Sequence, residues 1–217
     1  FTTNNNYNIS DGNQVGTFGI LANSPIANPY NEDGSMKRTV RLALGESYVL
    51  TRGIVEGLQK DGLWLDETRG FATYNAVYGE VKIPWVQGLK YRVNLGLDFI
   101  QSNNGNYTGE GVNNVNPATE STAGIGNAHT YHWTLENIVT FDRTFAQKHN
   151  FNFTGLYSAE QQKYNSSSMS ARDIPSDAFQ FYNLGHASGE ITVNPANQNY
   201  YLWGLTSWMG RIMYAYD

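Results

Sequence analysis

Apolar and polar residues alternate along the chain, most regularly between residues 90 and 99. The apolar positions are Tyr91, Val93, Leu95, Leu97 and Phe99, and the polar positions between them are Lys90, Arg92, Asn94, Gly96 and Asp98. Successive side chains of a β-strand point to opposite faces of the sheet. The pattern therefore predicts a strand with one apolar face and one polar face.

Similar patterns predict further strands on both sides of this one. The predicted strands cover residues 74–83, 90–99, 131–142, about 150–158 and 203–216, with a further short strand within 179–192. A shorter alternation runs over 40–44. Residues 1–35 are predicted to form loops, with a turn over 28–34, because they are rich in Asn, Gly, Pro and Asp. Residues 54–68 fit either a helical turn or a connection.

The connections between the predicted strands alternate between short and long. The short ones span 84–88 and 143–149, whereas the long ones span 102–130 and 163–178. Outer-membrane β-barrels combine short periplasmic turns with longer extracellular loops. By this comparison the short connections lie in the periplasm and the long ones outside the cell.

The lengths of the strands and the positions of the aromatic residues also favour a membrane barrel. Strands of globular proteins average about 5–6 residues, whereas a tilted membrane strand needs about 9–11. Amphipathic aromatic rings form belts at the two membrane interfaces of such barrels. The residues predicted for the belt are Trp85, Tyr91, Tyr131, Trp133, Trp203 and Tyr214. A soluble β-sandwich or propeller also alternates, and it remains the alternative architecture.

The number of predicted strands is too small for a closed membrane barrel. Single-chain barrels have at least 8 strands, and an open sheet edge in lipid leaves backbone groups without hydrogen bonds. We therefore expect an all-β, transmembrane antiparallel β-barrel of which this chain is a partial segment, within a longer polypeptide or an assembly of chains.

The composition excludes several other classes of protein. The chain has 15 Tyr, 10 Phe and 5 Trp, a charged fraction of 15% and a net charge of -5. The aromatic content argues against disorder, and the absence of a basic stripe argues against nucleic-acid binding. The chain has no cysteine, which excludes disulfides and thiol catalysis. It has no apolar run long enough for a membrane helix, and its polar first residues are not expected to act as a signal peptide.

Several stretches resemble the SusC/RagA family of TonB-dependent outer-membrane transporters of Bacteroidetes. They are PYNEDGS at 29–35, YNAVYGEVKI at 74–83, GLKYRVNLG at 88–96, TLEN at 134–137 and LTSWMGRIMYAYD at 205–217. The family pattern is an aromatic-rich strand, a Gly-Leu turn and a strand with inward-pointing Arg or Lys and Asn. The stretches occur in the order in which they occur in that family.

The resemblance implies both a fold and a function. Residues 1–217 would be an internal part of one 22-stranded barrel domain, without the plug and the C-terminal end of the barrel. The whole protein would be a nutrient import channel in the bacterial outer membrane, taking up an oligosaccharide or a peptide. Its partners would be a SusD-like surface lipoprotein that acts as a lid, TonB through N-terminal parts that are absent, and the lipid bilayer with its lipopolysaccharide.

Two groups of residues are the candidates for functional roles within such a barrel wall. The polar face of the strands is predicted to face the lumen or a plug with Lys90, Arg92, Asp98, Glu136, Asp142 and Arg211. Aromatic rings in the loops can stack on sugars and peptides. The loop residues predicted to contact substrate or partner are Tyr107, Tyr164, Phe179, Phe181 and Tyr182.

The sequence carries no motif of a known catalytic, nucleotide or zinc site, so no enzyme activity, cofactor or metal is expected. One alternative is a glycoside hydrolase that uses a pair of carboxylates among Asp98, Glu136, Asp142 and Glu190. His129 and His132 are close enough in sequence to contact one metal ion, although ordinary polar roles in a loop and at a strand end explain them better. A further alternative is a soluble or surface carbohydrate-binding or adhesin domain.

Overall fold

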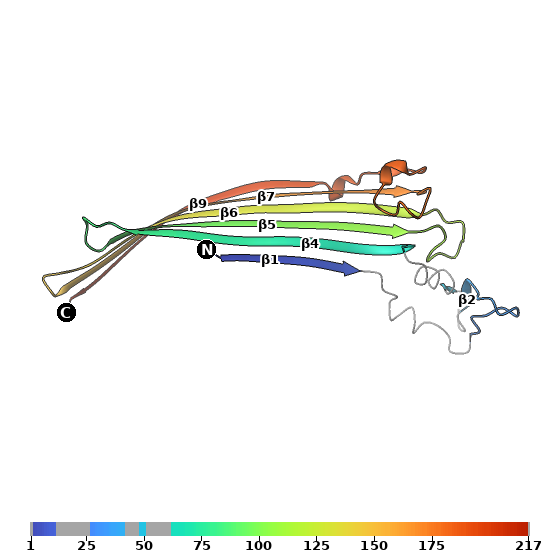
Figure 1. Cartoon of the computed structure of the whole chain (residues 1–217), viewed down its shortest axis with the longest axis horizontal. Helices are drawn as coiled ribbons and strands as arrows, with labels where there is room; N and C mark the ends of the chain where they lie inside the picture. Colours follow the sequence, from blue (N-terminus) through green and yellow to red (C-terminus); the bar gives the residue numbers. More distant parts are fainter. Residues whose placement is uncertain (1, 12–26, 42–47, 51–61, 217) are drawn as a thin grey trace.

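The computed structural model describes residues 2–11, 27–41, 48–50 and 62–216, and most of them belong to long strands (Figure 1). The strands are β1 (Thr2–Asp11), β2 (Thr39–Arg41), β3 (Tyr48–Leu50), β4 (Trp64–Lys82), β5 (Leu89–Thr108), β6 (Thr122–Phe145), β7 (His149–Arg172), β8 (Ile191–Thr192) and β9 (Asn199–Tyr216), and the two short 3₁₀ helices are η1 (Leu184–His186) and η2 (Pro195–Asn197). No helix in these parts of the chain has the length and hydrophobicity needed to cross a membrane.

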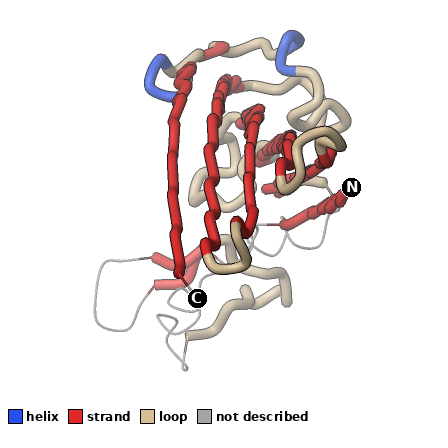
Figure 2. The backbone as a smooth tube through the Cα atoms, turned by 90° about the vertical axis from the view of Figure 1, so that its left-hand side faces the viewer, coloured by secondary structure: helices blue, strands red, loops and turns tan. Residues whose placement is uncertain are grey.

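The long strands form one antiparallel sheet in the order β1-β4-β5-β6-β7, and both β8 and β9 pair with the far side of β7. Strands β4 to β7 are neighbours in sequence and in space, so the chain runs up and down as a meander. The strands follow one another in a curved layer that does not close (Figure 2). The predicted all-β fold of a partial barrel is therefore confirmed.

Each pair of long strands keeps one register from end to end, without a bulge. Leu95 lies opposite Leu135, and on the other face Asn94 lies opposite Glu136. Because successive side chains point to opposite faces, all odd-numbered residues of a strand share one face and all even-numbered residues share the other. We call the face of Leu95 and Leu135 the apolar face, and the face of Asn94 and Glu136 the polar face.

The strands extend well beyond the regular alternation, so the predicted loop over 102–130 is wrong. Strand β5 continues to Thr108 and β6 begins at Thr122, which leaves only 109–121 between them. Asn104 and Asn106 lie opposite Gly126 and Gly124. The amide of each asparagine occupies the space where a Cβ of the facing glycine would stand. Cross-strand packing thus stabilises residues that have a low intrinsic preference for strands.

The N-terminal segment is also more regular than predicted. Residues 2–11 form β1, which pairs with residues 67–76 of β4. Backbone pairing along β4 explains this strand, although its sequence is dominated by Asn and Thr. The predicted turn over 28–34 is present, with the Asn31 amide donating to the Ser35 carbonyl oxygen at 2.8 Å. Of the other early predictions, residues 42–47 and 54–61 lie outside the described residues.

The second predicted long connection is displaced along the chain. Strand β7 continues to Arg172, so the connection spans 173–198 and contains η1, β8 and η2. The short strand expected within 179–192 is β8, and the last strand begins at Asn199, four residues before its predicted start. In both cases the added residues continue an existing ladder of backbone hydrogen bonds.

The short connections lie together at one end of the sheet and the long connections at the other (Figure 1). The turn after β4 is closed by hydrogen bonds between Ile83, Val86 and Leu89. Gly88 in this turn has a φ of +90°. Its carbonyl oxygen accepts a hydrogen bond of 3.0 Å from the Asp142 amide of β6, and a Cβ at Gly88 would overlap the Asp142 backbone. The turn therefore requires glycine for its conformation and for the close approach of β6.

Candidate functional site

The polar face carries a connected set of charged and amide side chains across β4, β5 and β6. Arg92 Nε donates to Asn94 Oδ1 at 2.7 Å, and Asn94 Nδ2 donates to Glu136 Oε2 at 2.8 Å. The Arg92 guanidinium also lies 4.2 Å from the centre of the Tyr78 ring. These contacts hold opposite charges on one wall of the sheet in fixed positions.

His132 lies further along the same face, between two carboxylates. Its Nδ1 is 3.2 Å from Asp98 Oδ2 on β5, and its Nε2 is 3.6 Å from Glu160 Oε2 on β7. The ring of Trp203 on β9 lies 6.2 Å from the imidazole. Only the doubly protonated imidazole can donate from both nitrogens. The arrangement therefore presents a histidine and two acceptors for a polar ligand or a neighbouring domain.

Strands β7 and β9 extend the polar face with hydroxyl, amide and aromatic groups. The hydroxyls of Ser158 and Ser207 are 2.7 Å apart. Gln162 Nε2 donates to the Tyr201 hydroxyl at 3.1 Å, and the Tyr201 ring stacks on Tyr164 with their centres 4.9 Å apart. The face therefore offers donors, acceptors and aromatic rings along its length.

All of the residues predicted to face a lumen or plug share this polar face. By register they are Lys90, Arg92, Asp98, Glu136, Asp142 and Arg211. The sequence reasoning missed Glu160 and Gln162, because the predicted strand ended at residue 158. The alternation continues through Ala159 and Glu160 but stops at Gln161, so a longer search along the strand could have found Glu160 but not Gln162.

The residues predicted for the aromatic belt lie in three different environments. Tyr91, Tyr131, Trp133 and Tyr214 lie on the apolar face. Trp85 lies in the turn after β4 and is 83% exposed. The predicted position of Trp203 in the belt is corrected, because its register places it on the polar face beside His132. The prediction considered only how close each aromatic residue lies to a strand end. It did not consider the alternation of side chains between the two faces, which places Trp203 on the polar face.

A small hydrophobic core lies at the loop end of the sheet. Its centre is Tyr107, which is 0% exposed and whose hydroxyl donates to Asp177 Oδ1 at 2.5 Å. Burial raises the pKa of the Tyr107 hydroxyl, and the hydrogen bond to the Asp177 carboxylate raises this pKa further. The core is completed by Ala123, Ala171, Ile174, Phe181 and Leu184. The connection after β7 therefore folds back onto β5 and β6 and is fixed there.

This core changes the interpretation of the five loop aromatics. Tyr107 is fully buried, so it supports the loop and is not a surface for substrate. Tyr164 belongs to β7 and to the polar face, not to a loop. Phe181 packs into the core, and Phe179 is half-buried with its ring 5.6 Å from that of His186. Tyr182 alone of the five is largely exposed, at 62%.

Two of the carboxylates predicted from the sequence, Asp98 and Glu136, do not form the pair that a glycosidase requires. Asp98 lies opposite His132, whereas Glu136 lies four positions further along β6, about 14 Å away at about 3.4 Å per residue. Glycosidases place their carboxylates within about 5–9.5 Å. Within the described residues no cluster of three or more His, Asp or Glu side chains is arranged to hold a metal ion.

Comparison with known proteins identifies the fold but not a family. No protein-family model matches the sequence, and no curated protein matches it. Among solved structures, the chain is similar to one of the RagAB peptide transporter, with a TM-score of 0.72 and 12% sequence identity over 99% of this chain. Structures of the RagAB peptide importer in the "closed-closed" and "open-open" states match with TM-scores of 0.65 and 0.66, each at 14% identity. The chain spans 24% of each of these longer transporter chains.

Proposed function

We propose that this chain forms part of the barrel wall and the extracellular loops of a SusC-like, TonB-dependent nutrient import channel in the outer membrane of a Bacteroidetes bacterium. The observation that carries the proposal is the sheet with one apolar and one polar face, in continuous register across six strands. In this proposal residues 1–217 are one segment of a barrel domain of about 22 strands, a size at which such barrels hold a plug in the lumen.

The dimensions of the apolar face support a position in a bilayer. From Tyr91 to Phe99 the apolar residues of β5 span about 27 Å along the strand, at about 3.4 Å per residue. Strands of outer-membrane barrels are tilted by about 35–45°, so this length rises about 19–22 Å across the membrane, most of the lipid-facing band of about 25 Å. Tyr91 and Tyr214 lie at the end near the short turns, whereas Tyr131 lies opposite Phe99 at the other end. These two levels match the two aromatic belts of a membrane barrel.

The polar face would then line the lumen. The groups around Arg92, Glu136 and His132 are suited to contact with a plug domain or with a polar substrate, because they offer both charges and both kinds of hydrogen-bonding group. A peptide is the first substrate to test, since the similar solved structures are peptide transporters. A SusD-like lipoprotein would close the loop end, and TonB would act through the plug.

The assignment of the two faces can be tested in the full-length protein. The chain contains no cysteine, so a spin label can be attached at Leu95→Cys or at Asn94→Cys without competition within this segment. In bilayers the label at 95 is expected to collide with dissolved oxygen, and the label at 94 with a water-soluble nickel chelate. Equal accessibility of the two labels to the chelate would contradict a membrane wall.

Uptake by whole cells tests the transport activity. Cells that express the full-length protein are expected to accumulate a labelled oligopeptide, and to stop doing so when TonB is deleted or the proton gradient is collapsed. A labelled oligosaccharide serves as the second substrate. The alternative hypothesis, a soluble or surface binding domain, would gain support if the chain alone gave a folded, monodisperse monomer without detergent.

A further inference from the structure

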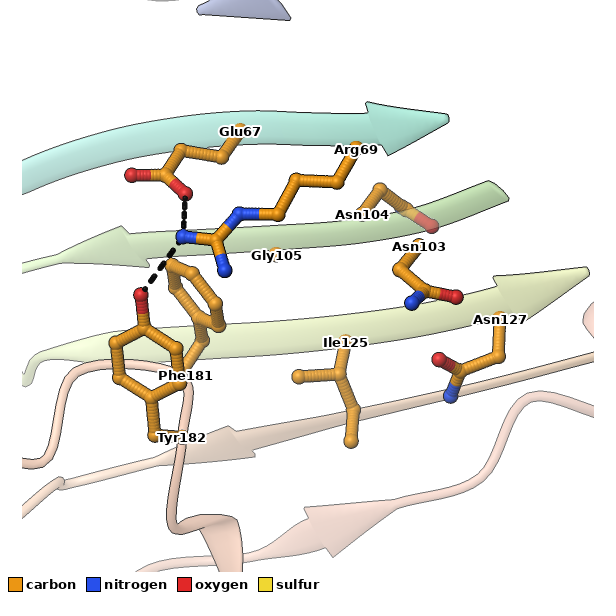
Figure 3. A pocket seen from close by; sticks show the side chains of 9 residues that line it. All are labelled: Glu67, Arg69, Asn103, Asn104, Gly105, Ile125, Asn127, Phe181 and Tyr182. Atoms are coloured by element: carbon orange, nitrogen blue, oxygen red, sulfur yellow. Dashed lines mark hydrogen bonds and ion pairs between the residues drawn. The ribbon is translucent and has the colours of Figure 1, made fainter. Parts of the chain in front are cut away.

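A cavity of about 270 Å³ lies at the loop end of the sheet, between β4, β5, β6 and the connection after β7 (Figure 3). Its lining includes Glu67, Arg69, Asn103, Asn127, Phe181 and Tyr182. We propose that this cavity binds one neutral sugar ring of the glycolipid that surrounds the protein in the membrane. This inference rests on the proposed function for its orientation, and it assigns the site to the outside of the barrel rather than to the transport path.

The position of the cavity follows from the register of the strands. Arg69 lies opposite Asn103, and Asn103 lies opposite Asn127. Because side chains alternate along each strand, all three lie on the apolar face, the face of Leu95. They are four residues beyond the row of Phe99 and Tyr131, about 14 Å further along the strands. A cavity on the lipid-facing side and beyond the aromatic belt adjoins the carbohydrate of membrane glycolipids, whereas the imported substrate passes on the opposite face.

The connection after β7 forms one wall of the cavity and is held rigidly. The Phe181 ring packs directly on Gly105, where a Cβ would overlap the ring. The rings of Phe181 and Tyr182 are adjacent, with their centres 4.3 Å apart. Phe181 is anchored in the buried core around Tyr107. The aromatic wall is therefore preformed, which reduces the entropy lost when a ligand binds.

The polar groups of the cavity fit a neutral ligand with several hydroxyls. Arg69 Nη2 donates to Glu67 Oε2 at 2.8 Å and to the Tyr182 hydroxyl at 3.2 Å (Figure 3). Because Glu67 neutralises Arg69, the site carries no net charge that would favour an anion such as phosphate. The side chain of Asn127 has no hydrogen-bond partner among the described residues, and its amide can donate to one hydroxyl and accept from another.

The size of the cavity limits the ligand. Pockets for drug-sized molecules start at about 300 Å³, and they combine apolar walls with a few well-placed polar groups. The cavity lies just below this size, so it suits a single ring. Apolar C–H groups of a pyranose would pack on Phe181 and Tyr182, while its hydroxyls reach Glu67, Arg69 and the two asparagines.

Binding to the full-length protein tests the inference with three probes. They are glycolipid purified from the host, its lipid-free carbohydrate released by mild acid, and free glucose, galactose and mannose. The test variant is N103A/N127A, and the control is Asn5→Ala, which lies on the same face in β1 but outside the cavity. We expect the test variant to weaken binding of the glycolipid and of its carbohydrate at least tenfold, and the control to leave both unchanged.

Three results would overturn the inference. One is equal binding of the glycolipid by wild type and test variant. Another is binding of the free sugars without binding of the glycolipid carbohydrate, which would make the ligand a soluble sugar. The third is a larger loss of substrate uptake than of glycolipid binding in the test variant, which would place the cavity on the transport path. The proposed function is tested separately, by the spin-label and uptake experiments. Its outcome does not depend on these binding measurements.

Discussion

Single residues at the loop end show how a polar connection is fixed on a sheet. Tyr107 is buried at the centre of the loop core, and its hydroxyl reaches the exposed carboxylate of Asp177. The Phe181 ring packs on Gly105 of the same strand. The core thus joins β5 to a connection 70 residues later in the sequence. The order of this connection depends on a few contacts, and each of them can be tested.

Tyr107→Phe is expected to lower the free energy of opening the loop by about 1 kcal/mol, because one hydrogen bond is lost while Asp177 remains hydrated. Hydrogen exchange of the amides in 173–187 measures this opening. The stability of the loop also depends on pH, because the folded state favours the neutral form of the Tyr107 hydroxyl. The stabilisation is complete below about pH 10, the ordinary pKa of tyrosine, and is lost as the pH rises above it. The variant should lack this dependence, and an identical pH profile would contradict the role of Tyr107.

Gly105→Ala is expected to displace Phe181 and to destabilise the loop by about 1–3 kcal/mol, the usual range for overpacking. Limited proteolysis of the connection after β7 reports the displacement. Gly79→Ala on the neighbouring strand is the matched control, because a Cβ there meets no atom within 4 Å. Equal cleavage of the two variants would show that Phe181 adapts without leaving the core.

At the scale of elements, the structure depends on how neighbouring strands fit together. Asn104 and Asn106 of β5 fill the space over Gly126 and Gly124 of β6, so two sequences with weak strand preference form a regular ladder together. At the opposite end, the turn at Gly88 brings β6 close to the end of β4 and the start of β5. Strand pairing thus decides both the length and the junctions of the strands.

Gly88→Ala is expected to reduce the fraction of correctly assembled protein, because alanine is strained at a φ of +90° and its Cβ would overlap Asp142. The heat-modifiable migration of the full-length protein on gels separates folded barrel from unfolded chain. Gln87→Ala, at the exposed preceding position of the same turn, should assemble normally. Normal assembly of both variants would mean that the turn can rearrange.

At the scale of the whole molecule, the two faces of the sheet define its relation to the surroundings. The apolar face is bounded by aromatic levels near Tyr91 and Tyr131, and the polar face carries the groups around Arg92 and His132. The sheet remains open in the described residues, with β1 and β9 as its outermost long strands. The proposed barrel therefore places the same strands in contact with lipid on one side and with water or a plug on the other.

Leu95→Arg is expected to destabilise the barrel in a bilayer by about 2–4 kcal/mol, the effect of an arginine on the lipid face near the membrane centre. Ala76→Arg is the control on the polar face, where the facing residue is Gly96 and leaves room for the new side chain. Urea titration of the full-length protein in lipid vesicles compares the two. A larger effect of Ala76→Arg would reverse the assignment of the faces.

The sequence alone determined the strands from 74 to 99 and from 131 to 142, and the division of their residues between two faces. Periodicity is a local property of the chain, and it remains visible wherever one face is apolar and the other polar. It also placed Arg92, Asp98 and Glu136 on one face of the sheet.

Only the tertiary structure decided where the strands end and which residues are accessible. Residues 2–11, 102–108 and 122–130 are too polar for the alternation to reveal them, and they form strands because neighbouring strands supply their hydrogen bonds and fill the space over their glycines. Tyr107 and Tyr182 looked equivalent in the sequence, yet one is buried and the other exposed, because the distant connection after β7 folds over one of them. Such long-range contacts leave no periodic trace in the chain, and they are what forms the cavity beside Arg69.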